Sequence, residues 1–300
     1  MPIHVPPLSR RQFLAGSLAA GAGLLWGDRL QAATVDAQRF ALLADIHLWE
    51  HRDREARSIR PAARFVQARD QLLALSPRPA AAIVAGDCAF GEGHAGDYAV
   101  LAELVQPIRQ AGLPLHFLMG NHDHRDNFYA AFPEARPNGT PPVVDRHVAL
   151  LETPVANWLL LDSLEKTNYV PGRLGKEQLE WLARTLDAHP DKPALVMAHH
   201  YPDHKPKTTG LEDTQALLDV LLPRKQAKAF VFGHSHRWEL STQDGLHLVN
   251  LPTLVWVFDK AQPAGWVDAR LRPDGIALTL NALDKSHPAH GQIVDLKWRS

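Results

Sequence analysis

Cysteine is nearly absent from this sequence, which has only Cys88 among its 300 residues, so an internal disulfide framework is excluded. Net charge is also small: the formal value is -1, and no basic stripe points to nucleic acid as a partner. We find no internal repeat, no low-complexity run and no linker long enough to separate domains. These absences favour one large α/β domain, or at most two small ones, in a chain of this length.

The N-terminus carries a pattern typical of an export signal. Ser9-Arg10-Arg11-Gln12-Phe13-Leu14 resembles the twin-arginine motif, and residues 15–26, rich in Ala, Gly and Leu, follow it. That segment is shorter than the ~20 apolar residues of a membrane span but suits the apolar part of a signal peptide. It departs from the pattern at Ala15, where lysine is common, and at residues 30–33, where neither possible cut has a small residue three positions before it.

We therefore expect residues 1–33 to be a twin-arginine-type signal peptide, with an uncleaved anchor or a chance arginine pair as the alternatives. This interpretation predicts a periplasmic or secreted protein. It makes the twin-arginine export machinery a partner, and it predicts no stable membrane span in the mature form.

From Arg39 onward, short apolar runs alternate with amphipathic stretches. The runs predict buried strands at 40–44, 80–85, 115–119, 158–161, 194–198 and 229–232, and the stretches predict helices at 62–75, 98–111, 176–188 and 213–222. Leu179, Leu182 and Leu186 show the spacing of a helix packed on a sheet. After His236 we expect consecutive strands at 239–242, 246–250, 253–258, 265–271 and 276–280, with Asp-Gly turns at 244–245 and 274–275.

This pattern predicts an α/β fold, specifically a four-layer α/β/β/α sandwich of two mixed β-sheets flanked by helices. The domain is expected to span residues 35–283. Residues 284–300 show little periodicity and are expected to form a C-terminal tail.

Five short polar clusters follow expected strands. They are Asp45-Ile46-His47, Gly86-Asp87, Gly120-Asn121-His122-Asp123, His199-His200 and Gly233-His234-Ser235-His236. Loops at the C-terminal ends of strands in an open α/β sheet converge on one crevice, so these residues can meet there. Each cluster taken alone is readily explained by polar residues that cap a strand, but the ordered set favours a metal site.

The residue types in these clusters suit a pair of adjacent metal ions. Carboxylate and imidazole ligands favour Mn, Fe, Zn or Co, and an amide adds a neutral oxygen donor. Asp87, alone in its cluster, is the natural candidate to bridge two ions, which would sit about 4 Å apart, hold a hydroxide at neutral pH and clamp a phosphoryl group. His122 is surplus to the ligand count and can act as general acid, with Asp123 holding and polarising its imidazole.

The ordered set resembles the calcineurin-like metallophosphoesterase superfamily, whose pattern D-x-H, G-D, G-N-H-[DE], H and G-H-x-H runs here from Asp45 to His236. The resemblance implies one metal held by Asp45, His47, Asp87 and His236, and a second held by Asp87, Asn121, His199 and His234, with His122 catalytic. Chain order, the compact G-N-H-D and residues 174–182 are similar to the bacterial cyclic-nucleotide and glycerophosphodiester phosphodiesterase branch. His199-His200-Tyr201-Pro202 departs from the His-His-Pro-Pro often found there.

We therefore expect a dinuclear-metal phosphoesterase acting on a small phosphate ester, with phosphodiesters favoured. A phosphomonoesterase or nucleotidase of the same superfamily, and a non-catalytic metal-binding scaffold, are the alternatives. His94, His124 and Tyr201 are the expected substrate contacts because they lie on loops near the metal clusters. For Cys88, a buried apolar role is the simpler interpretation.

Overall fold

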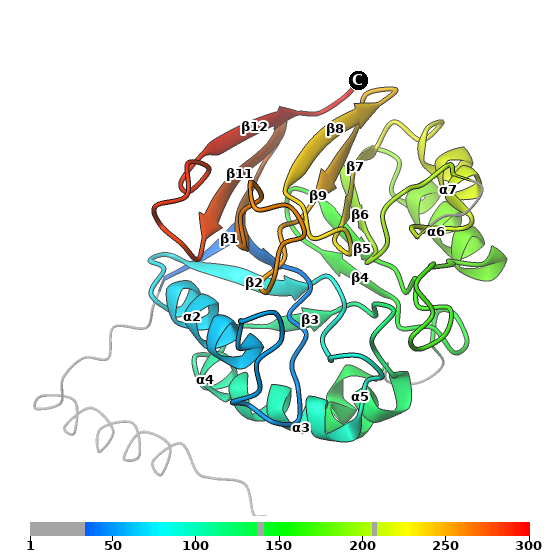
Figure 1. Cartoon of the computed structure of the whole chain (residues 1–300). Coiled ribbons are helices and arrows are strands. Elements are labelled where there is room, and N and C mark those ends of the chain that lie inside the picture. Colours follow the sequence, from blue (N-terminus) through cyan, green and yellow to red (C-terminus); the bar gives the residue numbers. More distant parts are fainter. Residues whose placement is uncertain (1–33, 137–140, 206–208) are drawn as a thin grey trace, which may run out of the picture. The chain divides into compact units, whose positions relative to one another are not determined.

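Two six-stranded mixed sheets form the centre of the computed structural model, which describes residues 34–136, 141–205 and 209–300 (Figure 1). The first sheet has the order β12 (Ile293–Lys297), β11 (Gly275–Ala282), β10 (Gly265–Arg272), β1 (Val35–Leu43), β2 (Arg78–Val84) and β3 (Leu115–Phe117). The second has the order β4 (Ala149–Glu152), β5 (Asn157–Leu160), β6 (Ala194–Met197), β7 (Ala227–Phe232), β9 (Leu246–Asn250) and β8 (Glu239–Gln243). In each sheet the parallel strands carry the loops with the polar clusters.

Helices cover the outer face of each sheet, as Figure 1 shows. The first sheet packs on α2 (Pro61–Leu73), α3 (Ala95–Leu104), α4 (Gln106–Gln110) and α5 (Arg125–Ala131), and the second on α6 (Lys176–Ala188) and α7 (Thr214–Leu221). A short 3₁₀ turn, η2 (Pro133–Ala135), follows α5. The predicted four-layer α/β/β/α sandwich is confirmed.

Strand alternation explains why both faces of each sheet are buried. In β1, Phe40 and Leu42 join the core between the sheets, while Ala41 and Leu43 face the helices. In β6, Leu195 likewise faces the other sheet. Because successive side chains point to opposite faces, a continuous apolar run supplies two cores at once.

Two expectations about the C-terminal third are wrong. Residues 253–258 form an irregular segment, buried at 253–256, instead of a strand. The expected tail contributes β12, which pairs antiparallel with β11, and the compact unit extends from Val35 to Ser300. The helix expected at 98–111 is divided into α3 and α4, and β4 and α5 were not anticipated.

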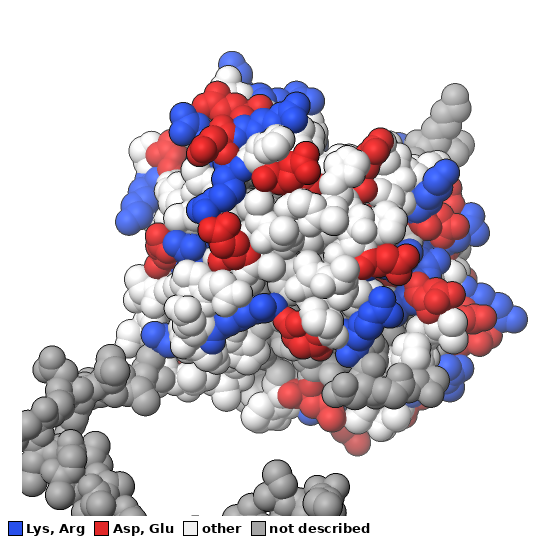
Figure 2. All heavy atoms as spheres, turned by 90° about the horizontal axis from the view of Figure 1, so that it is seen from below, with Lys and Arg blue, Asp and Glu red and all other residues white. Residues whose placement is uncertain are grey.

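The expected signal peptide at residues 1–33 lies outside the described residues. In the part of the chain that the structure describes, no helix combines the length and apolar character needed to cross a bilayer. Figure 2 shows acidic and basic side chains interleaved over the face seen from below, without a broad area of one sign.

Candidate metal centre

The backbone is strained at the polar clusters, where the chain leaves its strands. Five of the ten non-glycine residues with positive φ in the described ranges are expected metal ligands. They are Asp45 (54°), His47 (43°), Asp87 (49°), His234 (68°) and His236 (56°). Asp and His tolerate this region better than branched side chains, yet each such residue still costs about 1–3 kcal/mol. Strain of this kind, concentrated at one edge, is typical of functional sites.

One group of ligand atoms gathers around His47. Its Nε2 lies 3.2 Å from Nε2 of His236 and 3.7 Å from Oδ2 of Asp87. Nε2 of His236 is in turn 3.5 Å from Oδ1 of Asp45. All four side chains are buried. The structure thus brings together the four residues expected to hold one metal ion.

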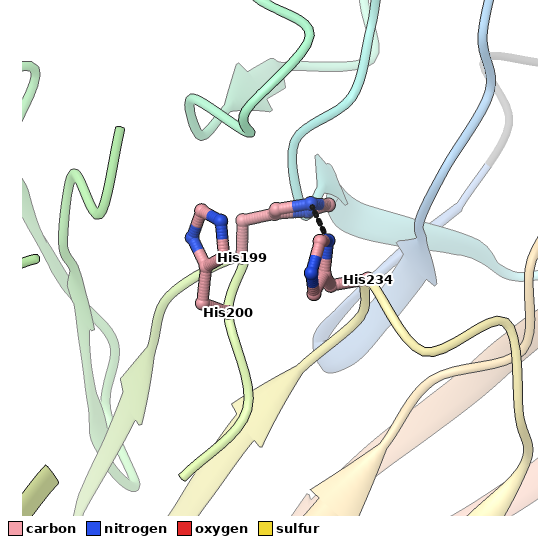
Figure 3. Close-up of side chains that lie close together, drawn as sticks. All are labelled: His199, His200 and His234. Atoms are coloured by element: carbon pink, nitrogen blue, oxygen red, sulfur yellow. Dashed lines mark hydrogen bonds between the residues drawn. The ribbon is translucent and has the colours of Figure 1, made fainter. Parts of the chain in front are cut away.

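A second group shares Asp87 with the first. Nε2 of His199 lies 3.3 Å from Oδ2 of Asp87 and 3.2 Å from Nδ1 of His234, a contact that is dashed in Figure 3. The Oδ1 atom of Asn121 is buried, has no hydrogen-bond partner among the described residues, and belongs to a side chain on the same cavity. Asp87 stands between the two groups, as a bridging ligand must.

Backbone carbonyls fix which nitrogen of each ring faces the site. The Nδ1 atom of His199 lies 2.7 Å from the carbonyl oxygen of Ala85, and Nε2 of His234 lies 2.7 Å from that of Thr209. A carbonyl only accepts hydrogen bonds, so these nitrogens carry the hydrogen. The opposite nitrogens, free to act as ligands, are therefore the two that approach each other.

This arrangement fits a cation. Lone pairs on nitrogens 3.2 Å apart repel one another unless a proton or a metal ion lies between them. The buried amide oxygen of Asn121 likewise lacks a partner, and a cation would satisfy it. Imidazole nitrogens with carboxylate and amide oxygens form a donor set suited to Mn, Fe, Zn or Co.

The charges of this cluster follow from its burial. Burial opposes ionisation of Asp87, but the nearby imidazoles, His199 foremost, hold the pKa of its carboxyl well below the usual range. Burial also opposes protonation of His199, yet the Asp87 carboxylate raises its pKa to about 9. Burial lowers the pKa of His234 to about 3. The cluster thus supplies an ionised carboxylate and a neutral ring, with one proton on His199 that a metal ion must displace.

His200, the neighbour of His199, is not available as a ligand. Its Nδ1 pairs with the hydroxyl of Ser163 at 2.8 Å, and its Nε2 pairs with the carbonyl of Val170 at 3.0 Å. Figure 3 shows it beside His199 and His234, but both of its nitrogens are already used. The ring of His200 also lies within 4.8 Å of the ligand atoms of His199 and His234, but its two partners make His199 the expected ligand of the adjacent pair.

His122 lies next to the first group, with a ring atom within 4.8 Å of the ligand atoms of His47 and Asp87. The expectation that Asp123 holds its imidazole is wrong: Nδ1 of His122 is 2.6 Å from the carbonyl oxygen of Gly91. This carbonyl orients the ring and leaves Nε2 as the free nitrogen.

Asp123 instead ties two ligand loops together. Its carboxylate accepts hydrogen bonds from the backbone N–H groups of Cys88 and Gly120, at 3.1 and 2.9 Å, and from the Tyr98 hydroxyl at 3.0 Å. Burial, with Asp87 nearby, raises the pKa of Asp123 to about 6. It is a positioning residue for Asp87 and Asn121.

Three of the five clusters begin with glycine because ligands lie against the backbone there. A Cβ atom at Gly233 would come within 2.7 Å of Oδ2 of Asp45, and one at Gly86 within 2.8 Å of His199. Such separations are too short for any side chain. Each glycine therefore allows a ligand from another strand to approach.

The ligands open onto a cavity of about 710 Å³. Tyr201, an expected substrate contact, lines it. His94 and His124 lie at the N-terminal caps of α3 and α5 and do not line this cavity, so their role as substrate contacts stays a prediction. Sequence analysis missed Trp256, whose ring stacks on His47 with centroids 4.9 Å apart and whose carbonyl faces Nδ1 of His236 at 2.6 Å. Other lining residues that the sequence did not indicate include Arg57, Phe90 and Phe258.

A profile described as calcineurin-like phosphoesterase matches residues 38–238, which is more than half of the chain and includes every expected ligand. The chain belongs to this family. The 3′,5′-cyclic adenosine monophosphate phosphodiesterase CpdA of Haemophilus influenzae is 27% identical over 249 residues, which cover 78% of this chain and 85% of that protein. A probable glycerophosphodiester phosphodiesterase GpdQ of Arcobacter nitrofigilis is 27% identical over 214 residues, covering 68% and 70%.

Solved structures share the fold of this calcineurin-like phosphoesterase. A dimetal phosphatase from Danio rerio aligns with a TM-score of 0.68 at 16% identity, over 88% of this chain and 99% of that one. GAP50, the anchor in the inner membrane complex of Plasmodium, aligns with a TM-score of 0.57 at 13% identity, over 87% and 89%. At these identities the likeness establishes the architecture alone.

Proposed function

We propose that this protein is a phosphodiesterase that works with two metal ions chosen from Mn, Fe, Zn and Co. The observation that carries the proposal is the shared position of Asp87, whose Oδ2 lies 3.3 Å from His199 and 3.7 Å from His47. A buried carboxylate placed between two groups of imidazoles is suited to bridging two cations.

The ligand residues divide between two ions around Asp87. Asp45, His47 and His236 would hold one, and Asn121, His199 and His234 the other. When bound, the ions supply an activated water at neutral pH and neutralise charge on the phosphoryl oxygens.

The remaining chemistry belongs to His122. His122 lines the cavity and its Nδ1 is held by the Gly91 carbonyl, so a proton on the free Nε2 can pass to the departing alcohol. Trp256 and Phe90 limit the access of water to the first group of ligands, since both rings pack near His47.

The preference for diesters is supported by two relatives, since CpdA of Haemophilus influenzae is a cyclic adenosine monophosphate phosphodiesterase and GpdQ of Arcobacter nitrofigilis is a probable glycerophosphodiester phosphodiesterase. The experiment compares bis(p-nitrophenyl) phosphate with p-nitrophenyl phosphate on protein loaded with Mn²⁺. We expect a higher kcat/KM for the diester. A monoester rate far above the diester rate would establish the alternative, a phosphomonoesterase, and no turnover of either compound would favour a non-catalytic scaffold.

We also propose export through the twin-arginine route, on the strength of Arg10, Arg11 and the apolar residues 15–26. Such a route accepts proteins that have already folded around a metal centre. Fractionating bacterial cells that express the full chain should place it in the periplasm or medium. Replacing both arginines by lysine should keep it in the cytoplasm, and an unchanged distribution would contradict the proposal.

A further inference from the structure

A tight hairpin stands at the mouth of the cavity. Ala56 and Ile59 pair as an antiparallel bridge, with backbone N–H···O distances of 2.8 and 3.0 Å in the two directions. Outside that pair, the guanidinium of Arg60 donates to Glu55 at 3.0 Å. The two residues between them, Arg57 and Ser58, form the turn.

The turn has an unexpected sequence for its shape. Both residues adopt the left-handed backbone conformation, with φ of 53° at Arg57 and 63° at Ser58. A two-residue hairpin turn with two positive φ angles strongly prefers Asn-Gly or Asp-Gly. Arginine and serine are strained there, and strain of this kind persists where the surrounding structure enforces it, commonly at ligand clamps.

Arg57 projects onto the cavity lined by the metal ligands. Its guanidinium lies over the ring of Phe258, 5.4 Å from the centroid, and no carboxylate of the described residues pairs with it. The other arginine on this wall, Arg237, already has Asp259 at 3.9 Å. Arg57 therefore offers unused hydrogen-bond donors to whatever enters the cavity.

Phe258 separates this cation from the metal ligands. Its ring lies against His236, with centroids 4.9 Å apart, and is 64% exposed in the cavity. The guanidinium thus stands one aromatic ring further out than the ligand. The reacting phosphate would be held beside His236, so Arg57 serves a different part of the substrate.

We propose that Arg57 is a specificity-determining residue that binds a second anionic group on the substrate, outside the reacting phosphodiester. The inference rests on the proposed phosphodiesterase function. A guanidinium matches phosphate and carboxylate with paired, charge-assisted hydrogen bonds, and Phe258 keeps it oriented for them. The substrate class is then a phosphodiester whose alcohol bears a phosphate or a carboxylate.

The experiment uses two substrates that differ by one phosphate: thymidine 5′-(p-nitrophenyl phosphate) and its 3′-phosphorylated form. Both release the same p-nitrophenolate. We expect the intact enzyme to favour the 3′-phosphorylated compound by about tenfold in kcat/KM, mainly through KM, as one charge-assisted contact allows. Arg57→Ala should abolish this preference and Arg57→Lys should retain part of it. The matched control is Arg54→Ala, since Arg54 lies on the same loop over Trp49 and outside the cavity lining; it should keep the full preference.

A double variant separates recognition from folding. Arg57→Asn with Ser58→Gly installs the residues that the turn prefers, so it should raise the melting temperature while the substrate preference disappears. An intact enzyme that treats both substrates alike, or an Arg57→Ala enzyme that keeps the preference, would overturn the inference.

The proposed function can fail separately. If neither compound is hydrolysed, the phosphodiesterase function is contradicted. The role of Arg57 is then decided by calorimetry, which compares the affinities of thymidine 3′,5′-bisphosphate and thymidine 5′-monophosphate for the metal-loaded protein. About tenfold tighter binding of the bisphosphate, lost in Arg57→Ala, would uphold the subsite. Equal affinities would overturn it.

Discussion

Nε2 of His199 lies 3.2 Å from Nδ1 of His234, and the same Nε2 is 3.3 Å from Oδ2 of Asp87. Three electron-rich atoms this close need a positive charge among them, which is either the proton on His199 or a metal ion. Backbone carbonyls orient both rings and the Asp123 carboxylate ties the Asp87 and Asn121 loops together, so the arrangement is built before any ion arrives. The account of function depends on that preorganisation.

Replacing His122 by alanine should slow hydrolysis according to the leaving group. A departing alcohol of high pKa needs a proton from the ring, so kcat should fall by about 10²–10⁴-fold for a simple alkyl diester. With p-nitrophenolate as the leaving group, the loss should be much milder. Rates measured across a series of leaving groups check this, and equal losses throughout would exclude His122 as the acid.

Gly233→Ala should weaken metal binding without a change of backbone conformation. The new methyl group would meet Oδ2 of Asp45 at 2.7 Å and Cβ of Ala44 at 2.9 Å, so the carboxylate must move. Misplacing one ligand in this way should lower affinity by about 10–100-fold, measured by titration with Mn²⁺. Gly112→Ala is the control: its methyl group has open space, and its φ of 70° should cost about 1–2 kcal/mol of stability without touching the metal site. Equal metal affinity in both variants would contradict the close-approach argument.

His147 should make stability depend on pH. Burial lowers the pKa of His147, which accepts from the Tyr129 hydroxyl at 2.7 Å and faces the Phe117 carbonyl at 3.0 Å. The unfolded chain takes up a proton near pH 6.5, whereas the folded ring stays neutral to lower pH, so stability is lost as pH falls through 6.5. Denaturant unfolding at pH 7.5 and 5.5 should show that the natural protein loses more unfolding free energy between these pH values than His147→Gln does. Identical losses would refute this role.

Arg299 should stabilise the fold from the C-terminal end. Its guanidinium donates to the carbonyls of Leu221, Arg224, Ala227 and Asp244, at 2.7 to 3.3 Å. Arg299→Ala leaves these acceptors without their charged donor and should cost about 1.5–3 kcal/mol of unfolding free energy. Arg184→Ala, which removes an exposed arginine 4.0 Å from Glu180, should change stability by no more than about 0.5 kcal/mol. A comparable effect in both would show that the C-terminal residues contribute nothing specific.

The sequence predicted the layers well because the buried strands are apolar on both faces. It failed at residues 253–258, an apolar run that forms no ladder with a neighbouring strand. There Leu254 donates to the Ala44 carbonyl and the Thr253 hydroxyl donates to that of Asp45, so the segment supports a strand exit. Apolar composition alone cannot distinguish a buried strand from an irregular buried segment of this kind. The edge strand β12 was missed because it is short and half exposed, with Ile293 65% exposed.

The candidate metal ligands could be gathered from the sequence because their side-chain types identify them within the clusters. The groups that orient these side chains could not be predicted, because most of them are backbone carbonyls and any residue type supplies a carbonyl. The carbonyls belong to Ala85, Thr209 and Trp256. The misplaced role of Asp123 has the same cause, since Gly91 holds His122 through its backbone. The role of Arg57 was not predicted, because its turn lacks the Asn-Gly pattern that indicates a hairpin.

The most direct test measures bound metal and diester hydrolysis together in the natural protein and in Asp87→Ala. We predict two ions per chain in the former. In the variant we predict fewer than two ions and a loss of turnover of at least about 100-fold, because the shared ligand is gone. A single ion per chain in the active natural protein, or an Asp87→Ala variant that still hydrolyses the diester after chelation, would contradict the account.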